Sequence, residues 1–297
     1  RSLSLRAAAP QIAALAEADG SLVEAAARAR SASSSPGGTV FAGLRGGVGG
    51  LVPATLEASG ADVRLGSTVR ELRRTPDGRW QLTVGPTTDV ELTEADAVVL
   101  ATPAAPTAKL LSPHAGAAAS ELASIEYASM AIVSLAVPRD AIGGSVDSSG
   151  FLVPPVDGHT IKAATISSRK WPWIDGASHE FVLLRVSIGR AGEADLLQRT
   201  DEELVALALA DLADAIELRG APADFHVQRW GGALPQYAVG HLDLVRRVDE
   251  SIAGVAGLEV CGAAYSGVGV PAVIATGHAA ATRVADHIRN VPATEGQ

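Results

Sequence analysis

Runs of apolar residues alternate with runs at helical spacing along the chain, and this pattern predicts a fold of mixed strands and helices. Short apolar or alternating runs bounded by turn residues predict strands at Asp62–Leu65, Thr68–Arg74, Trp80–Val84, Asp89–Leu92, Ala97–Ala101, Ala128–Val137, Thr160–Ser167, Glu180–Ile188, Phe225–Gln228 and Leu258–Cys261. Longer amphipathic runs predict helices at Pro10–Ala18, Ser21–Arg30, Leu51–Ser59, Asp201–Leu218 and Pro271–Arg289.

Local sequence signals predict where a turn lies and which strand is buried. Pro76-Asp77-Gly78 is typical of a hairpin turn between two strands. The continuous run Val98–Leu100 predicts a strand buried on both faces. The character of the chain changes between Pro106 and Asp224, where long strands surround one strong helix. We therefore predict a second sheet-plus-helix domain inserted into the first, which the C-terminal helix completes.

The segment Gly257–Ala281 combines a buried strand, a glycine-dense turn at Gly262–Gly269 and a helix opened by Pro271. Glycine allows close approach of the backbone to a ligand. The first amides and the positive end of the helix then favour an anionic or electron-rich group. Gly267–Ala272 also fits the pattern GxGxxG/A, but no second strand with a terminal acidic residue follows. A tight strand–helix connection without a ligand is the alternative.

Composition limits the classes of function. The 297 residues allow two domains, and the net charge of −9 argues against general nucleic-acid binding. No apolar run reaches the roughly 18–20 residues of a membrane span. The single cysteine, Cys261, excludes an internal disulfide and fits a reducing compartment. The histidines are scattered, so no metal site is predicted.

Several motifs together resemble one family. Trp230–His241 reads WGGALPQYAVGH, Gly262–Pro271 reads GAAYSGVGVP, Asp96–Pro103 reads DAVVLATP and Phe41–Gly47 reads FAGLRGG. In these segments the chain resembles the protoporphyrinogen/coproporphyrinogen oxidases of the FAD-dependent amine oxidase superfamily. The resemblance covers nearly the whole chain, and PQYAVGH is its most specific part.

The resemblance implies an α/β fold with α+β character: a partial, Rossmann-like FAD-binding domain with an inserted mixed-sheet substrate-binding domain. Residues 1–36 would be a helical part of the substrate domain, and 37–105 the first FAD-binding segment. Residues 106–229 would form the substrate-binding domain, 230–290 the C-terminal FAD-binding segment and 291–297 a tail. The strand–GxGxxG–helix unit that holds the FAD pyrophosphate in the family is not found. We therefore expect a C-terminal part of a longer flavoprotein that alone is inactive and holds FAD weakly or not at all.

The resemblance also implies site residues. Gly267, Val268, Gly269 and Val270 would offer backbone groups to the flavin, Trp230 would lie near its ring, and Val69 would contact adenine through its backbone. Leu152, Arg185 and Ser187 would line the substrate pocket, with Lys162, Arg169 and Lys170 as further partners for propionates. Arg185 stands among apolar strand residues, where an unpaired guanidinium would be costly. His241 is interpreted as structural, with a catalytic base as the alternative.

The resemblance thus predicts an oxygen-using, FAD-dependent oxidase of haem biosynthesis, in which the flavin performs the chemistry and no residue is a protein nucleophile. Its substrate would be coproporphyrinogen III, or else protoporphyrinogen IX, in the cytoplasm. Peripheral membrane contact and a homodimer stay open. The alternatives are another oxidase of the superfamily, acting on amines or carotenoids, and a non-catalytic flavin-fold binding module. The single aromatic residue in Ala263-Ala264-Tyr265 argues against an amine cage.

Overall fold

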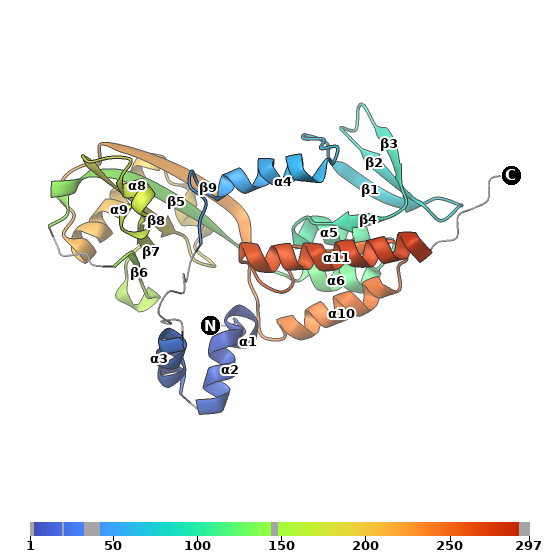
Figure 1. Cartoon of the computed structure of the whole chain (residues 1–297), viewed down its shortest axis with the longest axis horizontal. Coiled ribbons are helices and arrows are strands. Elements are labelled where there is room, and N and C mark those ends of the chain that lie inside the picture. Colours follow the sequence, from blue (N-terminus) through green and yellow to red (C-terminus); the bar gives the residue numbers. More distant parts are fainter. Residues whose placement is uncertain (1–2, 20, 33–41, 144–147, 291–297) are drawn as a thin grey trace. The chain divides into compact units, whose positions relative to one another are not determined.

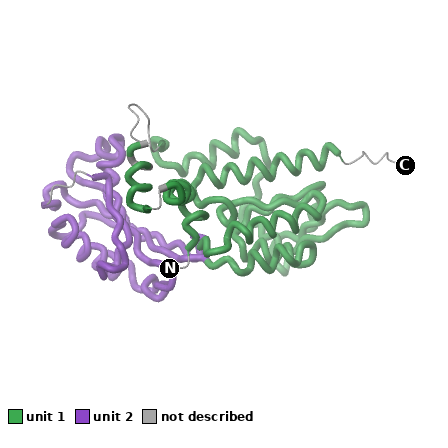
Figure 2. Tube along the Cα trace, turned by 90° about the horizontal axis from the view of Figure 1, so that it is seen from below, with its two compact units in different colours: residues 1–126, 236–297 green, residues 127–235 purple. Residues whose placement is uncertain are grey.

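The computed structural model describes residues 3–19, 21–32, 42–143 and 148–290 and divides into two compact units. Unit 1 spans residues 1–126 and 236–297, and unit 2 is the continuous segment Tyr127–Pro235 (Figure 2). The predicted α/β class with an inserted sheet domain is therefore found. The predicted tail 291–297 and Phe41, the first residue of FAGLRGG, lie outside the described residues.

Unit 1 contains two small sheets and most of the helices (Figure 1). Its strands are β1 (Val69–Arg74), β2 (Trp80–Val84), β3 (Glu91–Ala95), β4 (Val98–Leu100) and β10 (Leu258–Val260). Its helices are α1 (Leu5–Ala8), α2 (Pro10–Asp19), α3 (Leu22–Ala32), the 3-10 turn η1 (Val48–Gly50), α4 (Leu51–Ser59), α5 (Ala104–Leu111), α6 (Gly116–Ala123), α10 (His241–Ala253) and α11 (Val270–Asn290). β1, β2 and β3 form an antiparallel meander, and β10 pairs in parallel with β4.

The β1–β2 turn forms as predicted at Pro76-Asp77-Gly78. Gly78 adopts φ +85°, and its N–H donates to the Thr75 carbonyl at 3.0 Å. Trp80, fully buried at the start of β2, packs edge-on against His114 at 4.9 Å between ring centroids. This contact fixes the meander against the loop that follows α5.

Three strand predictions need correction. Asp62–Leu65 is an exposed, irregular segment rather than a strand. Two glycines at positive φ, Gly60 and Gly66, bracket it, and no described strand pairs with it. Asp89–Leu92 is shifted, because the register of Ala95 opposite Trp80 moves β3 to Glu91–Ala95. Val99 in β4 is 38% exposed, so β4 is buried on one face only.

Unit 2 is a five-stranded sheet in the order β6-β7-β8-β5-β9. Its strands are β5 (Tyr127–Pro138), β6 (Gly150–Leu152), β7 (Ile161–Ile166), β8 (Phe181–Ile188) and β9 (Asp224–Pro235). Its helices are α7 (Ser167–Lys170), α8 (Pro172–Asp175) and α9 (Asp201–Ile216), with 3-10 turns η2 (Arg139–Ala141), η3 (Pro155–Asp157) and η4 (Ala194–Gln198). β9 extends well past the predicted Phe225–Gln228, because it pairs along β5 as far as Pro235.

One face of this sheet is the core of unit 2. Strict alternation on β8 sends Val182, Leu184 and Val186 to that face, where α9 covers the sheet. α9 begins with a complete capping box between Thr200 and Glu203. Within unit 2, the opposite face of the sheet carries the residues between these core positions, and we call it the open face.

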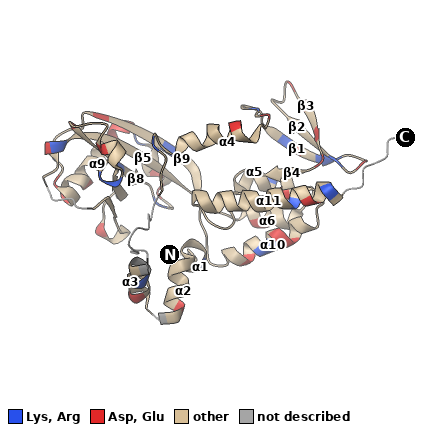
Figure 3. Ribbon diagram, in the orientation of Figure 1, with Lys and Arg blue, Asp and Glu red and all other residues tan. Residues whose placement is uncertain are grey.

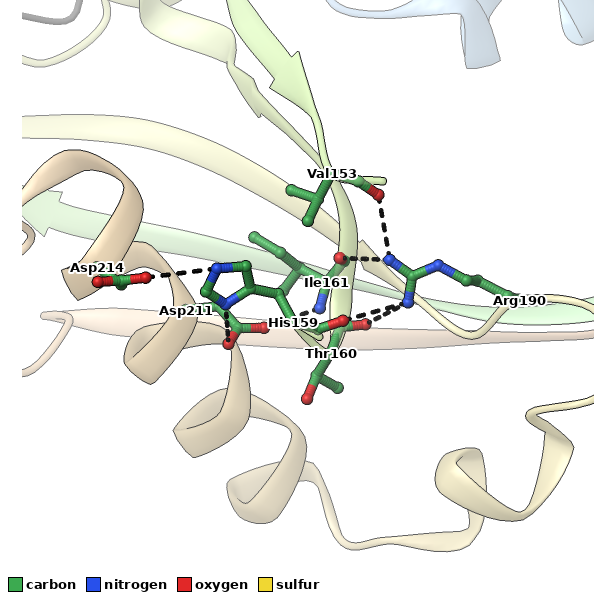
Figure 4. Close-up of polar contacts among 7 residues, drawn as sticks. All are labelled: Val153, His159, Thr160, Ile161, Arg190, Asp211 and Asp214. Carbon is green, nitrogen blue, oxygen red and sulfur yellow. Dashed lines mark hydrogen bonds and ion pairs between the residues drawn. The ribbon is translucent and has the colours of Figure 1, made fainter. Parts of the chain in front are cut away.

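A polar cluster fastens the edge of the sheet to α9 (Figure 4). Asp211 on α9 accepts the Ile161 N–H at 2.8 Å and lies 3.1 Å from His159 Nδ1, while Asp214 lies 3.3 Å from His159 Nε2. The Arg190 guanidinium reaches the carbonyls of Val153, His159, Thr160 and Ile161. Most of these acceptors are backbone groups, so the cluster orders the segment before β7.

The helices α5 and α6 lie in unit 1, although residues 106–126 were assigned by sequence to the inserted domain. Buried alanines and leucines explain this location: Ala118, Ala119 and Leu122 of α6 are each at most 7% exposed, and α6 packs with α5 and α10. Residues 3–32 also belong to unit 1, where Ser4 N–H donates to the Tyr237 carbonyl at 2.7 Å.

Candidate flavin turn and open sheet face

The glycine turn between β10 and α11 presents unpaired backbone amides. Gly267 adopts φ +136°, and a Cβ built there would lie 2.7 Å from Ala272 Cβ, so the turn accepts only glycine at this position. Among the described residues, the N–H groups of Val268, Gly269 and Val270 have no protein acceptor. Val268 and Val270 are about half exposed, so this backbone is accessible to a ligand. The turn therefore fits an electron-rich group that accepts hydrogen bonds.

Gly269 differs from Gly267. It does not adopt positive φ, and the nearest atom to a built Cβ is Pro271 Cδ at 3.9 Å. The protein itself thus leaves room for a side chain at position 269. A requirement for glycine there would come from a bound ligand rather than from the fold.

Side chains of the PQYAVGH segment brace this turn from one side. The Tyr237 hydroxyl donates to the Ala263 carbonyl at 2.6 Å and accepts the Gly267 N–H at 2.9 Å. The Tyr237 ring stacks on His241, with centroids 4.0 Å apart. Both side chains are buried, at 5% and 3% exposure. The specific motif is therefore a support for the glycine turn.

His241 supports the turn as a neutral side chain. Its Nε2 lies 3.0 Å from the Tyr265 carbonyl, so this nitrogen donates. Burial lowers the pKa of His241 below its ordinary value of 6.5, an effect that the hydrogen bond to Tyr265 only partly offsets. A buried ring bonded to a backbone carbonyl matches the predicted structural role rather than the alternative of a catalytic base.

Thr276 braces the turn from the other side and was not picked out from the sequence. Its Oγ1 accepts the Gly262 N–H at 2.9 Å and donates to the Val273 carbonyl at 2.7 Å. The sequence signal is a threonine in the second turn of the helix that follows the glycines. Cys261, just before the turn, is buried, and burial raises the pKa of its thiol, as suits an unreactive core residue.

Four predicted residues lie on the open face of the unit 2 sheet. Leu152 and Ser187 are both register partners of Ala163. Arg185 lies two positions before Ser187 on β8, and Trp230 continues the same alternation on β9, opposite Met130. Leu152 is 82% exposed and Trp230 52% exposed. The fold thus gathers on one surface residues that are nearly 80 positions apart in sequence.

Arg185 is not in the apolar setting that its sequence neighbours predict. Its apolar neighbours Val182, Leu184 and Val186 point into the core, whereas Arg185 points to the open face and is exposed. Solvation therefore removes the cost expected for an unpaired guanidinium. Lys162 is turned away from the role suggested for it, because its ammonium donates to the Gly189 carbonyl at 2.7 Å.

Val69 lies at the start of β1, opposite Val84 and beside a bulge before Glu71. It belongs to the β1–β2–β3 sheet, whereas Gly267–Val270 follow the separate β10–β4 sheet. No described contact joins it to the turn. Its assignment to adenine stays a prediction from the resemblance.

Positions of Lys and Arg alternate with positions of Asp and Glu along the ribbon of each unit in the described part of the chain (Figure 3). Within those same residues, none of the helices combines the length and apolar character needed to cross a membrane.

A braced glycine turn between a parallel strand and a long helix, in a chain with an antiparallel sheet as a continuous second unit, is compatible with a flavoprotein oxidoreductase. Comparison with known proteins agrees. The chain belongs to the family of flavin containing amine oxidoreductases, whose model matches residues 1–285.

Relatives within this family are close to the chain in sequence and structure. A coproporphyrinogen III oxidase of Mycobacterium tuberculosis (strain ATCC 25618 / H37Rv) is 36% identical over 292 residues, which is 95% of this chain. A coproporphyrinogen III oxidase of Bacillus subtilis (strain 168) is 31% identical over 188 residues, 63% of this chain and 39% of its own length. A crystal structure assigned as a candidate protoporphyrinogen oxidase, from Exiguobacterium sp. 255-15, matches with a TM-score of 0.76 and 28% identity over 97% of this chain and 60% of that one.

A cyclohexylamine oxidase from Brevibacterium oxydans IH-35A shares the fold, with a TM-score of 0.55 and 16% identity over 75% of this chain and 48% of that one. The chain spans 59% of the length of the mycobacterial relative.

Proposed function

We propose that this chain is part of an FAD-dependent porphyrinogen oxidase that acts on coproporphyrinogen III and uses molecular oxygen. The observation that carries the proposal is the 36% identity to a coproporphyrinogen III oxidase, sustained over 95% of the chain. The braced turn at Gly262–Val270 supports it, because the chain holds ready the backbone that a flavin would contact. Protoporphyrinogen IX is the alternative substrate.

The proposed role of each residue follows from where it lies. The amides of Val268, Gly269 and Val270 would bind the flavin, held in place by Tyr237 and Thr276. A flavin held there would supply the hydride-accepting, oxygen-dependent redox chemistry that oxidation of a porphyrinogen requires. The accompanying proton would leave to solvent, since His241 is buried and bonded to the Tyr265 carbonyl.

The open face of the unit 2 sheet would receive the substrate. Leu152 supplies an exposed apolar surface, Arg185 a cation and Ser187 a hydroxyl. Trp230, on the same face, would lie near the flavin ring. A tetrapyrrole with apolar rings and carboxylate arms needs this combination of apolar area and a few polar groups.

The buried, unpaired Cys261 suits a reducing compartment, so we assign the protein to the cytoplasm. A homodimer and peripheral membrane contact are compatible with this assignment.

The test uses the full-length protein that contains this chain. It should purify with flavin absorbance, release FAD on denaturation, and convert coproporphyrinogen III to a fluorescent porphyrin with consumption of oxygen. Faster turnover of protoporphyrinogen IX would reassign the substrate, and turnover of amines alone would reassign the reaction. A colourless protein would favour a non-catalytic binding module.

A further inference from the structure

Three polar side chains stand side by side across the open face of unit 2. In the sheet register, Ser134 on β5 is opposite Arg185 on β8 and, on its other side, opposite His226 on β9. Directly opposed residues of antiparallel strands carry their Cβ atoms on the same face, about 4.5–5.5 Å apart. The guanidinium and the imidazole therefore flank the serine hydroxyl in a single row.

A hollow lies over this row. Its volume is about 290 Å³, and both ends of the row and Ser134 line it. Ser167 and Ile174 form its rim from α7 and α8, while Leu183 and Ala136 add apolar surface from the sheet. A mostly apolar hollow with a few convergent polar groups is typical of a small-molecule site. Its size suits one arm of a tetrapyrrole and an adjoining ring edge rather than the whole molecule.

The polar groups of the row are available to a ligand. Among the described residues, the side chains of Arg185, Ser134 and His226 make no hydrogen bond or ion pair with one another or with a neighbour. Each can donate: the guanidinium through a planar fork, serine through its hydroxyl, and histidine through a ring N–H in either tautomer.

One acidic group shares the hollow. Asp224 lies two positions before His226 on β9, and its Oδ1 accepts the Phe225 N–H at 2.8 Å. It does not approach Arg185 or His226 closely enough for an ion pair within 4.0 Å in the described structure. The negative charge of Asp224 disfavours an anion next to it, so the favoured position for a carboxylate is directly above Arg185, Ser134 and His226.

We infer that Arg185, Ser134 and His226 form a receptor for one carboxylate arm of the substrate. Arg185 would bind the carboxylate with two parallel N–H bonds, Ser134 would donate from below and His226 from the far side. Leu183, Ala136 and Ile174 would contact the ring edge that carries the arm. This inference rests on the proposed function, and it adds Ser134 and His226 to the residues that select the substrate.

The test measures binding rather than turnover. Coproporphyrin III and its tetramethyl ester are titrated by fluorescence into the full-length protein with its flavin bound. Arg185→Ala should weaken binding of the acid at least tenfold, the size of a lost charged hydrogen bond, and Ser134→Ala and His226→Ala should weaken it about 3–10-fold. Binding of the ester should be the same in all variants, and His226→Gln, which keeps a donor, should restore part of the affinity for the acid.

Arg219→Ala and His179→Ala are matched controls, because both remove an exposed residue of the same type outside the hollow. Equal losses for acid and ester, or no loss in the Ser134 and His226 variants, would overturn the receptor while leaving the proposed function standing. Failure of the unaltered, flavin-loaded protein to bind either porphyrin would overturn both. The Tm of each variant identifies any that has lost its fold.

Discussion

The hydroxyl of Tyr237 should contribute measurably to the stability of unit 1, and Tyr237→Phe isolates that contribution. Phenylalanine keeps the ring that stacks on His241 and removes only the oxygen that joins Ala263 to Gly267. Each hydrogen bond contributes about 0.5–1.5 kcal/mol, and the two backbone groups left without their partner add a desolvation cost. We expect a loss of about 2–3 kcal/mol in the free energy of unfolding, or about 4–12 °C in Tm.

Hydrogen exchange locates the effect. The Gly267 amide should exchange faster in Tyr237→Phe, because the hydroxyl is its acceptor in the native chain. Thr282→Val is the control: its hydroxyl bonds only the His278 carbonyl on the exposed side of α11, so the change should stay within about 0.5 kcal/mol. A Tyr237→Phe chain that loses less than about 0.5 kcal/mol, with unchanged exchange at Gly267, would refute the bracing role.

Three further predictions follow from the geometry. Gly267→Val should lower Tm, because valine is strained at positive φ and its Cβ would clash with Ala272. Gly269→Val should keep Tm and reduce the flavin absorbance of the full-length protein. Normal flavin content in Gly269→Val would remove residue 269 from the cofactor site. Asp211→Ala should cost about 1–3 kcal/mol in denaturant unfolding by leaving the Ile161 N–H unpaired, and Asp214→Ala, at a 74% exposed side chain, no more than about 1 kcal/mol; equal costs would contradict the assignment. Because burial lowers the folded-state pKa of His241, the unfolded chain binds more protons below the ordinary value of 6.5, so stability should fall as pH drops through that value, and His241→Gln should reduce this dependence in unfolding curves taken from about pH 7.5 to about pH 5.5.

Local signals predicted most elements because they are properties of short segments. The turn at Pro76-Asp77-Gly78 and the helix beginning at Asp201 depend on nearby residues alone, and both form. Asp62–Leu65 has the composition of a strand but no partner in the described chain. A strand forms only when it pairs with another strand, and the sequence of the segment does not specify that partner.

The candidate site also has parts that the sequence identifies and parts that only the fold brings together. The glycine turn and PQYAVGH are contiguous motifs, so the sequence identifies them, but their mutual support through Tyr237 depends on a contact across 30 positions. The row of Arg185, Ser134 and His226 depends on the register of three strands. A shift of one residue in either pairing would turn one member of the row towards the core, and nothing local to Ser134 specifies that pairing.

Alternate residues of β8 have different roles: one set packs in the core and the other faces outward. Val182, Leu184, Val186 and Ile188 hold the sheet to its helix, while the residues between them contribute little to that packing. The outward positions Leu183, Arg185 and Ser187 are therefore free to diversify at small cost in folding. A library confined to these three sites should yield mostly folded proteins with altered ligand preference, which makes this strand a natural starting point for redesigning selectivity.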